Sequence, residues 1–101
     1  MAHSLKSAAF LIETRIADAA MGKVEALYEL GVVYSTGSDG VDVDLIEAHK
    51  WFNLAALSGS CLAQQCRADI AEDMTAREIA EAQRQARAWL TDMADRRPHA
   101  A

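Results

Sequence analysis

The chain contains one sequence unit that occurs once in full and returns in a weaker form about one helical hairpin later. The full copy extends from Gly22 to Ala56. Small residues and a tryptophan recur at matching places, with Gly22, Ala26, Gly31, Ala48 and Trp51 of the full copy matched by Gly59, Ala63, Ala68, Ala86 and Trp89. Self-similarity at a fixed spacing is typical of helical repeat arrays. The sequence therefore predicts an all-α fold built from stacked helical hairpins.

Five helices account for most of the chain. Apolar residues at helical spacing and capping signals predict helices at residues 4–21, 23–35, 44–58, 61–72 and 75–94. Asp44 with Glu47, and Thr75 with Glu78, have the spacing of capping boxes, in which each side chain satisfies a free amide of the first turn. The alternation at residues 41–43 is too short for a strand and falls within a loop. Five helices with short connections stack most simply as antiparallel hairpins.

The totals restrict the class of protein. A chain of 101 residues forms a single domain, and the 51% apolar share is rich in alanine with few aromatics, which favours close packing of helices. The net charge of −5 disfavours nucleic acid as a partner, because phosphates bind to basic surfaces. The N-terminal apolar run is interrupted by Glu13 and Arg15, and no stretch reaches the length of a membrane span. We therefore expect a soluble cytoplasmic protein, without a membrane partner.

The full copy of the unit resembles a known repeat. Residues 20–56 and the start of the next unit are similar to the Sel1-like repeat, a relative of the tetratricopeptide repeat, at Gly22, Ala26, Leu30, Gly31, Tyr34, Gly37, Gly40, Val41, Asp44, Ala48, Trp51, Ala55, Ala56, Gly59 and Ala63. This resemblance implies a short right-handed α-α solenoid. It also implies that Ala26, Gly31, Ala48 and Ala55 lie where two helices touch. Proteins of this family mostly act as adaptors that hold other proteins, so the resemblance implies a bacterial adaptor without catalysis or cofactor.

The flanking segments depart from the complete repeat. We expect one domain over residues 1–101, with a leading helix at 4–21, a complete repeat at 22–58, a degenerate capping repeat at 59–94 and a frayed tail at 95–101. In the second unit, Arg67 stands at the place of Leu30, and the loop is reduced to three residues. A solenoid needs such a terminal repeat to close its exposed end. The leading helix resembles the second half of a preceding repeat, with Thr14 and Arg15 where tryptophan is expected.

Metal chemistry has little support in the sequence. Asp39, Asp42 and Asp44 share one loop, but a calcium loop centred on Gly40 would place its closing glutamate at Ile46. We therefore expect a solvated turn. The three histidines, His3, His49 and His99, are far apart, and His49 is expected on an exposed edge. No metal site is predicted.

The cysteines, arginines and tryptophans also favour structural roles. Cys61 and Cys66 are roughly 140° apart around one helix, so they cannot bridge each other and are expected to be small buried groups in a reducing compartment. The arginines of the last predicted helix alternate with acidic residues, which favours a solvated face with ion pairs over a nucleic-acid site. Trp51 and Trp89 are interpreted as packing residues. No nucleophile turn or phosphate loop is recognisable.

The partner site is predicted by analogy with tetratricopeptide repeats. The first helices of the two hairpins would line a groove with Glu25, Tyr28, Val32, Ser35, Leu62, Gln65, Asp69 and Glu72. This set lacks the lysines and asparagines that clamp a terminal carboxylate, and it contains three acidic residues. The expected ligand is another protein or peptide, with a basic or neutral segment and an apolar anchor.

Self-association is an alternative function. The leading helix has its main apolar face on Leu5, Ala8, Ala9, Ile12, Ile16 and Ala19, but a second apolar stripe consists of Phe10, Ala17 and Met21. This stripe would be covered by a second copy in a homodimer, by the partner, or by Phe10 folding down beside a neighbouring helix. A third class, a small regulator with nucleic-acid or enzymatic activity, remains open.

Overall fold

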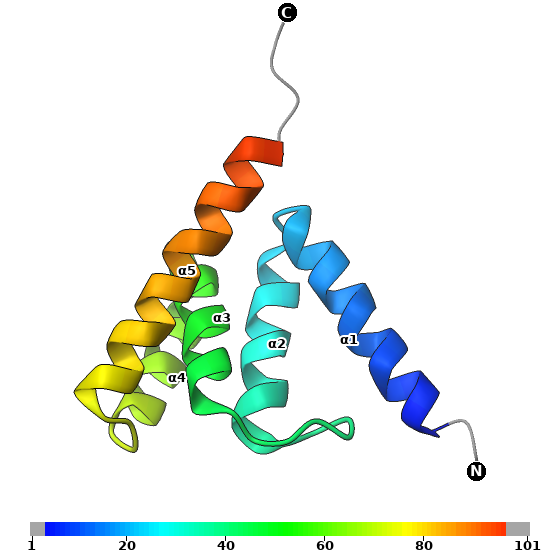
Figure 1. Cartoon of the computed structure of the whole chain (residues 1–101), viewed down its shortest axis with the longest axis horizontal. Coiled ribbons are helices and arrows are strands. Elements are labelled where there is room, and N and C mark those ends of the chain that lie inside the picture. Colours follow the sequence, from blue (N-terminus) through cyan, green and yellow to red (C-terminus); the bar gives the residue numbers. More distant parts are fainter. Residues whose placement is uncertain (1–3, 97–101) are drawn as a thin grey trace, which may run out of the picture.

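The computed structural model describes residues 4–96, with side chains from Ala9 onward, and consists of five α-helices (Figure 1). They are α1 (Ser4–Ala20), α2 (Val24–Thr36), α3 (Leu45–Leu57), α4 (Cys61–Ala71) and α5 (Ala76–Arg96). The described residues contain no strand, and the predicted all-α fold is confirmed. Predicted and observed helix ends agree within two residues. His3, His99, the side chains of Leu5 and Ala8, and residues 97–101 of the predicted tail lie outside the part described.

The complete repeat forms the centre of the molecule. α2 and α3 make the most extensive helix contact, and α3 also packs against α4 and α5. α1 packs against α2, so α1 and α5 stand at opposite sides with α2 and α3 between them (Figure 1). α5 contacts α3 more extensively than it contacts α4.

Small residues allow the helices to approach closely. Ala48, Ala55, Ala63 and Ala82 are fully buried, around the larger side chains of the core. Gly31 lies directly beside the buried ring of Phe52, and a Cβ atom at Gly31 would overlap that ring. The predicted close approach at Gly31 is confirmed, although its neighbour is an aromatic ring rather than a backbone.

Side-chain caps begin α3, α4 and α5. The Asp44 carboxylate accepts a hydrogen bond from the Glu47 amide at 3.1 Å, as expected, but the Glu47 carboxylate does not accept one from the Asp44 amide. Instead Glu47 accepts the indole N–H of Trp51 at 2.9 Å and the Lys50 ammonium at 3.0 Å, while the Asp44 amide donates to Tyr34. The predicted reciprocal capping box at Asp44 is therefore wrong, because the Glu47 carboxylate accepts hydrogen bonds from Lys50 and Trp51 of the same helix instead. The box of Thr75 and Glu78 is complete, with bonds of 2.8 and 3.1 Å.

Two expectations about burial are wrong. His49 is 3% exposed rather than at an edge, because α3 is covered by α2, α4 and α5. Its Nδ1 atom has no hydrogen-bond partner, and burial together with the charge of Arg67 lowers the pKa of His49. Cys61 is exposed because it is the first residue of α4, a helix in which Ala63 alone is fully buried. Cys66 is half-buried.

Candidate functional site

The predicted groove residues lie on the surface of two neighbouring helices, α2 and α4, which contact each other over a small area. We call this set of eight residues the α2–α4 surface: Glu25, Tyr28, Val32 and Ser35 on α2, and Leu62, Gln65, Asp69 and Glu72 on or just after α4. Glu25 and the four residues contributed by the α4 segment are exposed, whereas the other three are half-buried. The α2–α4 surface therefore combines exposed polar side chains with the exposed Leu62 and the half-buried Tyr28 and Val32.

Tyr28 fills the junction between the two helices. Its ring lies 5.8 Å from that of Phe52 at an angle of 48°. Burial raises the pKa of Tyr28, and the neighbouring Cys66 side chain of α4 raises it further. Tyr28 is thus a packing residue that contacts Phe52 of α3 and lies near Cys66 of α4.

The Ser35 hydroxyl forms a hydrogen bond within its own helix, α2. It donates to the carbonyl of Val32 at 3.1 Å, a bond that satisfies the donor within α2. Glu25 and Val32 therefore remain as the α2 side chains that can contact a ligand with their functional groups. On α4, Leu62 is 56% exposed and can contact a ligand.

The charge of the α2–α4 surface is acidic. Glu25, Asp69 and Glu72 are exposed, whereas Arg67, the basic residue of α4, is half-buried and donates to Asn53 of α3 at 2.5 Å. Arg67 forms no ion pair with these three acidic residues in the part of the chain that the structure describes. The electrostatic field at this surface favours a positively charged ligand.

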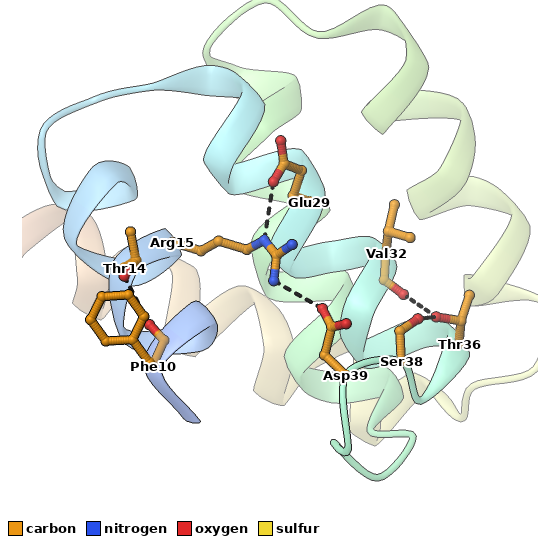
Figure 2. Close-up of polar contacts among 8 residues, drawn as sticks. All are labelled: Phe10, Thr14, Arg15, Glu29, Val32, Thr36, Ser38 and Asp39. Atoms are coloured by element: carbon orange, nitrogen blue, oxygen red, sulfur yellow. Dashed lines mark hydrogen bonds and ion pairs between the residues drawn. The ribbon is translucent and has the colours of Figure 1, made fainter. Parts of the chain in front are cut away.

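An ion-pair cluster that the sequence did not reveal holds α1 in place (Figure 2). The Arg15 guanidinium donates to Glu29 of α2 and to Asp39 of the following loop, each at 3.0 Å. The hydrogen bond with Glu29, aided by Asp39, raises the pKa of Arg15 against the opposing effect of burial. Asp39 adopts a left-handed backbone conformation with φ of 56°, which aspartate tolerates better than most residues. The signal in the sequence was an arginine at a place where the repeat expects an apolar residue, with an aspartate-rich loop to receive it.

A small charged hollow of about 350 Å³ adjoins this cluster between α1 and α2. Arg15, Asp18, Lys23, Glu25 and Glu29 contribute to its lining. Lys23 is paired with Asp18 at 3.4 Å. Glu25 of the α2–α4 surface therefore also borders α1, so a ligand bound there would reach toward the leading helix.

The residues of the predicted second stripe are exposed. Phe10 is 66% exposed and Met21 is 74% exposed, and Ala17 is exposed as well. The interpretation in which Phe10 folds down beside a neighbouring helix is wrong, because α1 packs on α2 with its other side. Leu11 is also 41% exposed.

The tryptophans and the arginines of α5 have structural roles. The rings of Trp51 and Trp89 form an edge-on pair with centroids 4.8 Å apart, which confirms that they pack together. Arg84 pairs with Glu81 at 2.6 Å and holds the pKa of Glu81 at about 2, and Arg96 pairs with Asp92 at 3.2 Å, so local ion pairs do form along α5. Within residues 4–96, no three histidine, cysteine or acidic residues are grouped so as to hold a metal ion. None of the helices described is long and apolar enough to cross a membrane.

The match to a known family falls on the central hairpin. A family model described as Sel1 repeat matches residues 24–60, which comprise α2, the loop after it, α3 and the turn to α4. The predicted resemblance is thereby confirmed for one repeat. No curated protein and no solved structure matches the chain.

Proposed function

We propose that this chain, a protein with one Sel1 repeat, binds a segment of another protein on its α2–α4 surface. Sel1 repeats are helical modules of protein–protein interaction that are typically non-catalytic. The α2–α4 surface is suited to such a role because it combines accessible apolar side chains with charged ones. This is the usual arrangement of specific protein interfaces.

The observation that carries the proposal is the exposure of Leu62 among acidic residues. Leu62 is 56% exposed, with half-buried Val32 and Tyr28 on the adjoining helix. Exposed Glu25 and Asp69 belong to the same two helices. An apolar side chain that packs on Leu62 would bury it, and a flanking lysine or arginine would pair with the carboxylates. The expected ligand is therefore a basic or neutral segment with an apolar anchor.

A charge-reversal experiment tests this proposal. Binding partners are first isolated from native lysate with the tagged chain, and the affinity of each identified partner is measured with purified proteins. The Glu25→Lys/Asp69→Lys double variant should weaken binding at least tenfold, because it repels the basic segment. This change corresponds to about 1.4 kcal/mol or more.

The matched control changes the same number of charges elsewhere. Asp42 and Asp95 are exposed in the loop before α3 and near the end of α5, so Asp42→Lys/Asp95→Lys alters the net charge equally. This control should change the affinity less than threefold. Equal weakening by both double variants would show a non-local charge effect and reject the α2–α4 surface.

A homodimer through α1 is the second candidate function. The exposure of Phe10 and Met21 favours it, since both side chains leave a solenoid end apolar where a cap is usually polar. Light scattering coupled to size exclusion should show a dimer that Phe10→Glu dissociates. Val43→Glu is the control, because Val43 is 57% exposed in the loop before α3. A monomer at high micromolar concentration would eliminate this candidate.

A further inference from the structure

His49 is a buried titratable residue with an unsatisfied nitrogen. It lies on α3 and is 3% exposed, and its Nδ1 atom has no hydrogen-bond partner within residues 4–96, which the structure describes. Buried polar atoms of folded proteins are nearly always hydrogen-bonded, so this exception needs an explanation. The imidazole does not belong to the α2–α4 surface, and close packing alone does not need a group that binds a proton. His49 is therefore a candidate for a role beyond packing.

The side of α3 that carries His49 faces α4. His49 and Asn53 are four residues apart on α3 and therefore share one face of that helix. Asn53 accepts a hydrogen bond from the half-buried Arg67 of α4 at 2.5 Å, and the charge of Arg67 acts on His49. These three residues form a polar group between α3 and α4, which we call the α3–α4 cluster.

The α3–α4 cluster accommodates a neutral imidazole and opposes a charged one. Burial lowers the pKa of His49 most, and the positive charge of Arg67 lowers it further. Asp69 and Glu72, the exposed carboxylates of the α4 segment, do not offset this effect. A protonated imidazole has an N–H donor on both nitrogens, and the donor at Nδ1 would have no acceptor. The folded arrangement therefore disfavours the cation through both its charge and its unsatisfied donor.

Among the described residues, no charge from α2 or α5 offsets that of Arg67. The titratable groups of α2 at its contact with α3 are the phenols of Tyr28 and Tyr34, and neither affects the pKa of His49. α5 lies on the opposite side of α3. Trp51, which packs on α5, is two residues from His49 and therefore roughly 160° away around the helix. The proton affinity of His49 thus depends on how closely α4 covers it.

α4 is the helix that can move without disrupting the central hairpin. It packs on α3, touches α2 over a small area, and has a still smaller contact with α5. Ala63 is the one residue of α4 that is fully buried. α5 has its own extensive contact with α3, so its position does not depend on α4. Displacement of α4 would separate Arg67 from His49 and admit water to the Nδ1 atom.

We propose that the α3–α4 cluster is a proton-sensitive switch, in which protonation of His49 loosens α4 from α3 while α2 and α3 stay packed on each other. The closed form contains the neutral imidazole. In the open form His49 is in water, and its pKa returns to the ordinary value of 6.5. Because the pKa in the closed form is lower, the closed form is fully favoured above pH 6.5 and loses its advantage as the pH falls toward the lowered value.

The consequence of this switch for binding rests on the proposed function. The α4 segment contributes Leu62, Gln65, Asp69 and Glu72 to the α2–α4 surface. Loosening of α4 would separate these residues from those of α2, so a partner bound at neutral pH would be released under mildly acidic conditions. The movement of α4 itself does not require a partner, and it can be measured on the chain alone.

Hydrogen exchange of the ligand-free full chain tests the switch. Protection factors, which correct for the pH dependence of intrinsic exchange, are measured by amide NMR at pH 7.5 and 5.5. The α4 amides should be less protected than those of α3 at both pH values, because α4 opens without global unfolding. Their protection should fall by up to about tenfold between the two pH values, the largest gain of an open form whose histidine has a pKa of 6.5. The α1 amides should change less than twofold, because loosening of α1 does not expose His49.

Histidine variants assign the effect to one residue. His49→Gln keeps a polar side chain that does not titrate in this range, and it should remove the pH dependence of α4 protection. The matched control is His3→Gln/His99→Gln, which removes the other two histidines and should behave as the parent chain does. Circular dichroism at pH 7.5 checks the helical content of each variant.

A titration of the parent chain provides a measurement that does not depend on the folding of His49→Gln. The imidazole signals of His49, followed by NMR from pH 8 to pH 5, should give a pKa below 6.5. Arg67→Gln removes the neighbouring charge and should move this pKa upward. A pKa of 6.5 or above in the parent chain would contradict the switch.

Three exchange results would also overturn the proposal. Equal protection of α4 and α3 would show that α4 opens only when the whole chain unfolds. Protection of α4 that does not change with pH, or that changes equally in His49→Gln, would show that His49 does not control α4. The charge-reversal experiment at pH 7.5, where His49 is neutral, tests the α2–α4 surface separately. Failure of the switch therefore leaves the proposed function standing, and failure of the proposed function leaves the movement of α4 standing.

Discussion

Gly31, a buried residue of the central hairpin, limits how closely its two helices can pack. Gly31 lacks a side chain at the place where the Phe52 ring lies, and the ring is 1% exposed and therefore has little room to move. A side chain at Gly31 must push the ring or separate α2 from α3. The small residue at this helix contact is therefore fitted to one aromatic ring.

We predict that Gly31→Leu destabilises the chain by about 1–3 kcal/mol or more. Leucine is a better helix former than glycine by about 1 kcal/mol, but the overlap with Phe52 outweighs that gain. A thermal melt followed by circular dichroism should show a midpoint lower by several degrees. Ala88→Leu, at an exposed position of α5, is the control and should leave the midpoint almost unchanged. An unchanged midpoint for Gly31→Leu would contradict the packing described.

His49 makes stability depend on pH in the mildly acidic range. Burial and the charge of Arg67 lower its pKa in the folded state, so the unfolded chain binds a proton more readily. The stability that His49 contributes is therefore complete above its ordinary pKa of 6.5 and is lost as the pH falls from there toward the lowered value. Urea unfolding at pH 7.5 and 5.5 should show a larger loss for the parent chain than for His49→Gln. Equal losses would show that His49 is not the titrating group.

Among the five helices, α1 has the weakest attachment, because it packs on α2 and on no other helix to a similar extent. The Arg15 cluster adds a polar connection from α1 to α2 and to the loop that follows. The side chains of Arg15, Glu29 and Asp39 are 24%, 49% and 33% exposed, so solvent screens both pairs and each contributes about 0–1 kcal/mol. The cluster therefore orients α1 more than it stabilises the whole chain.

We predict that Arg15→Gln loosens α1 without unfolding the rest. Amide exchange in α1 should accelerate several-fold, while the exchange of α3 stays within twofold of the parent chain. Lys23→Gln is the control, since it breaks a longer pair of 3.4 Å that does not join α1 to the loop. If α1 exchanges at the parent rate in Arg15→Gln, the apolar contact with α2 is sufficient to hold it.

For the helices, the sequence predicted features that depend on residues close together in the chain. It did not predict contacts between residues that are far apart in the chain. Asp44 and the pair of Thr75 and Glu78 marked helix starts correctly, because a cap depends on residues three apart. The partners of Arg15 are 14 and 24 residues away, so their meeting depends on how α1 lies on α2. The exposed positions of Glu25 and Leu62 on the α2–α4 surface followed from the repeat pattern. The repeat pattern did not predict that the Ser35 hydroxyl donates to the Val32 carbonyl, because a serine hydroxyl can bond either within its own helix or to a ligand.

In the whole molecule, the protection of backbone amides against hydrogen exchange should decrease from the central helix α3 to the outer helix α1. α3 contacts α2, α4 and α5, whereas α1 contacts α2. Hydrogen exchange of the parent chain should therefore be slowest for amides of α3 and fastest, among the described helices, for α1. Uniform exchange across the five helices would show a single cooperative unit and contradict this order.

The hollow of about 530 Å³ between the ends of α1, α3 and α5 is also a feature of the whole molecule, which explains why the sequence did not reveal it. Leu27, Leu57 and Leu90 each fit an ordinary helical pattern, and nothing in their spacing indicates that they meet. Their meeting depends on the excess length of α5 over α3 and on the contact that α5 makes with α3 instead of α4. These are properties of the packed helices rather than of any one of them.

The position of the two outer helices also has a mechanical consequence. α1 is attached to α2, and α5 is attached to α3, so the two outer helices hold different halves of the same hairpin. Tension applied between α1 and α5 would pass through the contact of α2 with α3, where Gly31 meets Phe52. The most extensive interface of the molecule is thus also the one that would bear the load.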